Sequence, residues 1–133
     1  MEKNEMLCEI MKQIQKKYSC VSEIHRLTEE VGTSLSRDDR VSVQMILAMR
    51  QDEMNASDEC DKSIELLIES LQIEEQCKVR ELLKLDDINE ADSIEGKKII
   101  EIKRNIRMIL ERCVQLDKAM STRVAGKDSF YSY

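Results

Sequence analysis

The feature that most constrains this chain is an unbroken heptad pattern between Ser93 and Val124. Its apolar side chains recur at alternating intervals of three and four residues, which keeps one side chain per turn on a single stripe of a helix. The stripe consists of Ile99, Ile102, Ile106, Ile109, Cys113, Leu116 and Met120. At ~1.5 Å per residue this helix would be about 48 Å long, so only other long helices can bury the whole stripe.

Composition favours a chain that is helical throughout. The 133 residues include no proline and three glycines, and charged residues make up 36% of the chain while aromatic residues make up 3%. This profile is typical of long solvated helices rather than of strands joined by turns. The length fits one domain, and we expect it to be all-α.

Two further long helices are predicted before the heptad stripe. Apolar periodicity predicts a first helix from Glu2 to about Leu35 and a second from about Arg37 to the low seventies. Ser36 and Asp39 have the spacing of a capping box at the start of the second helix, although glutamate or glutamine is the usual partner.

The remaining segments set the domain organisation. Residues 74–85 are predicted to continue the second helix or to form a short separate one, and residues 86–93 form a polar linker. Gly126 is expected to end the last helix. The sequence therefore predicts an antiparallel bundle of three long helices, with or without a short extra helix, over residues 1–125, followed by a flexible tail over residues 126–133.

Charge and hydropathy bear on partners and location. The formal net charge is −6, which argues against non-specific binding to nucleic acid or to an anionic membrane. No apolar run approaches the ~20 residues of a membrane span, and the first residues lack the uncharged core of a secretory signal. We therefore expect a cytoplasmic protein that does not insert into membranes.

No catalytic, cofactor-binding or metal-binding residue is predicted. The five cysteines are odd in number and widely spaced, so they are interpreted as reduced thiols that mostly pack between helices. His25 is the only histidine, and a half-exposed structural role is expected for it. Paired carboxylates such as Asp38-Asp39, Glu74-Glu75 and Asp86-Asp87 suit helix starts and helix surfaces. The chain is not expected to be an enzyme.

Two features favour a role in protein binding. Methionines in the second helix, Met45 and Met49 among them, offer a soft face that adapts to varied helical partners, although filling gaps in a core is the alternative. Three of the four aromatic residues, Phe130, Tyr131 and Tyr133, stand in the tail. Aromatic anchors in such a segment suit docking onto a partner, and incidental aromatics in an unstructured end are the alternative.

The layout resembles that of the FlgN-type flagellar export chaperones. The segments LTEEVGTSLSRDDR and VSVQMILAMRQDEM carry the resemblance, which is clearest over residues 27–54: a helix ends near Leu35, a polar turn contains Asp38-Asp39, and a new helix carries an apolar stripe and Arg50. The rest of the chain is similar only as a helical bundle.

The resemblance implies a non-enzymatic chaperone without a cofactor. Such a protein binds the C-terminal helical segments of flagellar hook-associated proteins and delivers them to the type III export apparatus. Read together with the methionines, it suggests a cargo-binding face of Met45, Met49, Ile64 and Ile68, and a docking role at the export gate for Phe130, Tyr131 and Tyr133. The alternative is a structural coiled-coil or adaptor protein that self-associates through its heptad seams, and a homodimer is left open.

Overall fold

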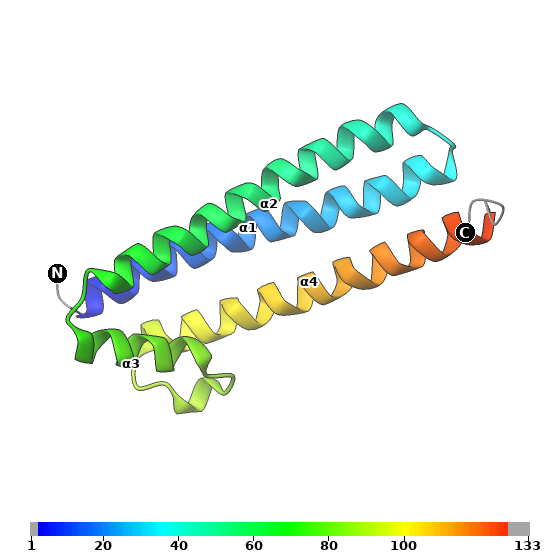
Figure 1. Ribbon diagram of the computed structural model, residues 1–133. Coiled ribbons are helices and arrows are strands. Elements are labelled where there is room, and N and C mark those ends of the chain that lie inside the picture. Colours follow the sequence, from blue (N-terminus) through cyan, green and yellow to red (C-terminus); the bar gives the residue numbers. More distant parts are fainter. Residues whose placement is uncertain (1–2, 128–133) are drawn as a thin grey trace.

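The computed structural model of the chain describes residues 3–127 (Figure 1). Its elements, in chain order, are α1 (Lys3–Ser36), α2 (Arg40–Glu69), α3 (Ile73–Lys84), the short 3-10 turn η1 (Ile88–Glu90) and α4 (Ile94–Lys127). Within these residues there is no strand, so the predicted all-α fold class is confirmed. Four α-helices lie within residues 3–127: the three long helices that were predicted, and α3, the short extra helix that the sequence left open.

Of two helix boundaries, the sequence left one open, and the other differs from the expectation. The chain leaves the helical conformation between α2 and α3, where Gln72 is extended and the Gln76 side-chain amide donates to the Leu71 carbonyl over 2.8 Å. At the other end, α4 continues through Gly126 to Lys127, so the expectation that Gly126 ends the helix is wrong. A glycine inside a helix costs only about 1 kcal/mol, and it ends a helix readily only when it adopts the left-handed conformation.

Helix α1 lies at the centre of the fold. It packs along its length against both α2 and α4, whereas α2 and α4 make almost no direct contact with each other. In Figure 1, α2 runs antiparallel to α1 and α4 runs parallel to it, with α1 between them. The three long helices therefore form an open arrangement in which α1 supports the other two.

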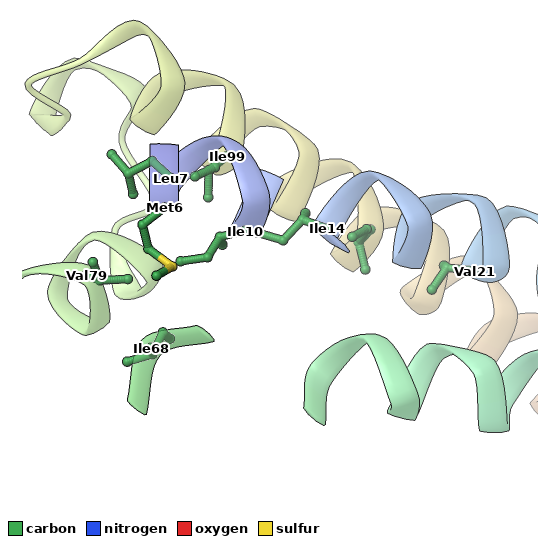
Figure 2. Packing of buried hydrophobic residues seen from close by; sticks show 9 residues of the cluster. Met6, Leu7, Ile10, Ile14, Val21, Ile68, Val79 and Ile99 are labelled. Atoms are coloured by element: carbon green, nitrogen blue, oxygen red, sulfur yellow. The ribbon is translucent and has the colours of Figure 1, made fainter. Parts of the chain in front are cut away.

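The densest part of the core lies near the start of α1. Figure 2 shows side chains from all four helices meeting there, and Ile10 and Ile99 are completely buried. The buried members of this cluster are Met6, Leu7, Ile10, Ile14, Val21, Ile68, Val79, Ile99 and Ile106. Along α4, alternate members of the heptad stripe (Ile99, Ile106, Cys113 and Met120) are buried, and the remaining members are half-buried. The stripe therefore faces α1.

The turn between α1 and α2 is closed by two aspartates. Asp38 has a positive φ of 58°, and the amide groups of Asp38 and Asp39 donate to the Leu35 and Ser34 carbonyls over 3.1 and 2.9 Å, a Schellman pattern. Asp39 then caps α2 by accepting hydrogen bonds from the amide and hydroxyl groups of Ser42. The predicted capping box is wrong, because the Ser36 hydroxyl donates back to the Gly32 carbonyl instead.

We predict that Ile106→Asp unfolds or strongly destabilises the bundle. The substitution buries a carboxylate without a partner, which costs several kcal/mol against a typical total stability of ~5 to 15 kcal/mol. Urea denaturation followed by circular dichroism measures the effect. Met108→Asp on the exposed side of the same helix is the matched control and should change the midpoint little; equal effects of the two variants would contradict the packing described.

We also predict that Asp38→Gly stabilises the protein. Glycine adopts positive φ without strain, so the free energy of unfolding should rise by about 0.5 kcal/mol. Asp38→Ala is the control, and it should lower stability by about 0.5 to 1 kcal/mol because alanine is strained in the left-handed region. Thermal melts of both variants test this, and an Asp38→Gly variant no more stable than Asp38→Ala would exclude the turn geometry.

Candidate protein-binding surface

The exposed methionines of α2 line a hollow beside the α1–α2 turn. Met45 is 63% exposed and Met49 is 47% exposed, although both are large apolar side chains. The hollow has a volume of about 290 Å³. Its other lining residues come from the end of α1 and the start of α2: Glu30, Thr33, Ser34, Arg37, Ser42 and Ile46. The lining thus combines apolar and polar side chains, as in many sites that receive a side chain from a partner.

The other two residues of the predicted cargo-binding face lie elsewhere. Ile68 is only 1% exposed and belongs to the core cluster, and Ile64 is half-buried against that cluster. Ile68 is therefore corrected from a surface residue to a core residue. The physical reason is that Ile68 packs with Val79 of α3 and Met6 of α1, so it is not available to a partner (Figure 2).

The walls of the hollow are fixed by local interactions. The α1–α2 turn holds the two helix ends through the Asp38 and Asp39 hydrogen bonds described above. On α1, the Arg26 guanidinium pairs with both Glu23 and Glu30, and its hydrogen bond lowers the pKa of the Glu23 carboxyl. Glu30 on the rim is therefore already engaged, while the methionines present an adaptable surface.

Next to this region, a polar junction connects the three long helices. Arg50 of α2 donates to the Thr28 hydroxyl oxygen of α1 over 3.1 Å and to the Asp117 carboxylate of α4 over 2.9 Å. Thr28 is completely buried and donates to the Ile24 carbonyl over 2.7 Å. A long side chain, rather than apolar packing, spans the distance between α2 and α4 here.

The cysteines and the histidine lie in different local environments. Burial, together with the nearby Cys60 and Glu53, raises the pKa of the Cys20 thiol, which keeps it protonated and poorly nucleophilic. His25 Nδ1 lies 3.3 Å from a Glu29 oxygen on the surface of α1. Cys77 is exposed, so it does not pack between helices. In the described part of the chain, no three His, Cys, Asp or Glu side chains could hold a metal ion.

The carboxylate pairs lie mainly at helix starts, as predicted. Asp39 caps α2, Glu74 and Glu75 occupy the first turn of α3, and Asp87 caps η1 through the Asn89 amide. Asp86 pairs with Arg107 of α4 over 2.9 Å, and this contact lowers the pKa of the Asp86 carboxyl. These groups stabilise the fold locally and do not converge on a common site.

The comparisons leave the family open. No protein-family model, curated protein or solved structure matches the chain. None of the helices within residues 3–127 combines the length and the apolarity that crossing a membrane requires. The aromatic residues Phe130, Tyr131 and Tyr133 lie outside the described residues.

Proposed function

We propose that this protein is a cytoplasmic helix-binding chaperone of the FlgN type, which holds the C-terminal helical segments of flagellar hook-associated proteins for type III export. The observation that carries the proposal is the exposed pair Met45 and Met49 beside the hollow at the α1–α2 turn. The resemblance of residues 27–54 to that family supports the identity of the partner, and these residues include the turn and both methionines.

The chemistry of the surface supports binding to an amphipathic helix. Met45 and Met49 are four residues apart, so they lie one above the other on α2 and form a short apolar ridge. Helix-in-groove recognition uses apolar anchors at such spacings, and unbranched methionine side chains adapt to differently shaped anchors. A chaperone that must accept more than one cargo segment benefits from this adaptability.

The burial of the heptad stripe favours the chaperone over the self-associating coiled coil. Ile99, Ile106 and Cys113 of α4 are buried against α1 within one chain. Self-association through this seam would require α4 to leave α1 and expose the core. The alternative therefore has a cost that binding at the methionine ridge does not have.

For the tail we propose a separate step. Phe130, Tyr131 and Tyr133 supply aromatic anchors that suit docking at the export apparatus. Cargo binding and docking would then rest on different parts of the chain.

We predict that Met49→Lys weakens the binding of cargo. Placing an ammonium group on the apolar ridge should reduce affinity by roughly 1 to 3 kcal/mol, the range of an interface hot spot. Calorimetry with the C-terminal segments of hook-associated proteins from the same organism measures this. Leu66→Lys, at an exposed position on α2 away from the hollow, is the matched control. If none of these segments bound the unaltered protein at ~100 μM, the chaperone proposal would be abandoned.

We predict further that deleting residues 128–133 impairs export but leaves cargo affinity nearly unchanged. The deletion ends the chain after α4, so the fold and the methionine ridge remain. Secretion of hook-associated proteins by cells carrying the deletion, together with calorimetry on the shortened protein, separates the two steps. Normal secretion would exclude a docking role for the tail.

A further inference from the structure

Helix α3 occupies a position between α2 and α4 at one end of the molecule. On one side, the Arg80 guanidinium pairs with the Glu65 carboxylate of α2, with one of its contacts at 3.0 Å. On the other side, the Lys103 ammonium of α4 donates to the Leu83 carbonyl at the end of α3. In Figure 1, α3 runs in the same direction as α4 and covers only the first part of it.

Beyond the end of α3, a hollow of about 450 Å³ follows the same side of α4. It begins at Lys103, the residue that fastens α3, and extends to Lys118. Ile106, Leu110 and Val114 form its apolar floor. Val114 is 50% exposed and Leu110 is 38% exposed, so these two side chains are open to solvent, whereas Ile106 is buried.

The side of α2 that contacts α3 also continues past the end of α3. Four residues nearer the N-terminus of α2 lie on the same stripe as Glu65, because helical spacing places them on one face: Asp61, Asp58, Met54 and Leu47. Beside this stripe, Lys17 of α1 pairs with Asp61 of α2 at 2.8 Å, and Arg50 of α2 spans the distance to Asp117 of α4. No helix follows α3 there among the described residues.

We infer that the groove running from Lys103 to Lys118, in line with α3, is a docking site for an amphipathic helix of another protein that carries acidic residues along the flank facing α4. Such a helix would take the place that α3 takes at the other end and would complete a four-helix arrangement. The inference does not depend on the proposed function, because the methionine hollow involves none of these residues.

Charge selects the acidic partner. Three basic residues, Lys103, Arg107 and Lys118, line the groove together with one acidic residue, Glu111, although the whole chain is acidic. Arg107 already pairs with Asp86, so an incoming carboxylate would meet Lys103 and Lys118. Burial and the neighbouring Lys17 lower the pKa of the Lys103 ammonium, and the smaller opposing effects of Asp86 and Asp61 do not offset them. A carboxylate brought beside Lys103 would stabilise the charged form of this ammonium group, which its burial disfavours. A helix with basic flanks would instead be repelled by the basic side chains of the groove.

The dimensions suit a helix of moderate length. From Lys103 to Lys118 the groove spans about 22 Å of α4 at ~1.5 Å per residue, or roughly four helical turns. Leu110 and Val114 lie one turn apart in its middle and can receive apolar residues spaced three or four apart.

Two synthetic helical peptides of about 18 residues test the inference. Both carry the same leucine stripe, and one has glutamate flanks whereas the other has lysine flanks. Fluorescence anisotropy with the full chain should show the glutamate peptide binding at least about tenfold more tightly than the lysine peptide. Backbone amide NMR should show its perturbations at residues 103–118 and not at residues 41–49.

Variants on α4 identify the surface. Val114→Glu should weaken the glutamate peptide by about tenfold, and Val114→Ser, which adds no charge, should weaken it by about threefold. Met108→Glu adds the same charge at an exposed position of α4 outside the groove, and it should have less than about a twofold effect. Both positions are exposed, and a thermal melt of each variant verifies that the fold is kept.

Three results would overturn the inference. The first is equal binding of the two peptides, or no binding of either. The second is an equal loss in Val114→Glu and Met108→Glu. The third is a dimer in analytical ultracentrifugation that Val114→Glu converts to monomer, because the occupant would then be a second copy of the chain. Failure of hook-associated segments to bind would leave this inference intact.

Discussion

The arrangement depends on the width of the apolar surface of α1. Its buried residues include the sequence neighbours Met6-Leu7 and Leu27-Thr28, and neighbouring residues are about 100° apart around a helix. A surface this wide can hold one helix on each side. On most of α4, by contrast, buried residues recur every seven positions, as Ile99, Ile106 and Cys113 do, so α4 offers a narrow stripe to one partner. Helix α1 therefore becomes the centre, and α2 and α4 are held apart.

The space between α2 and α4 is filled differently at the two ends of the molecule. At one end α3 fills the space, with Val79 in the core and Leu82 packed so closely to Gly96 that an added Cβ would lie 3.2 Å from it. At the other end, Arg50 reaches from α2 to Thr28 and Asp117. An arginine can span the distance because its long side chain stays mostly covered while the guanidinium satisfies both partners. The half without α3 consequently has apolar side chains that none of the helices within residues 3–127 covers.

The sequence predicted the periodic features and missed those that depend on three-dimensional neighbours. The heptad stripe of α4 and the polar linker could be predicted because each is a local sequence pattern. The burial of Ile68 was not, since its stripe looks the same whether or not α3 packs on it. Leu110 stands next to Ile109 of the heptad stripe, yet it is exposed because α3 ends before reaching it. The left-handed conformation of Asp38 was also missed, because glycine is the residue that usually indicates such a turn and none stands there.

Two of the four residues proposed for cargo binding, Met45 and Met49, lie together, and their exposure could not be derived from periodicity alone.

The two proposed surfaces are lined by different helices: the methionine hollow by α1 and α2, and the groove by α4 alone. On α2, Leu47 belongs to the stripe that continues past the end of α3, and it stands two residues from both Met45 and Met49, which places it on the opposite flank of α2, about 200° away from each around the helix. One straight helix cannot contact both flanks, because the body of α2 lies between them. Occupation of the methionine hollow therefore leaves the α4 groove free. The proposed chaperone, if it keeps a cargo helix bound while it contacts a second protein, requires two surfaces that do not compete, and the wide apolar surface of α1 meets this requirement by holding α2 and α4 apart.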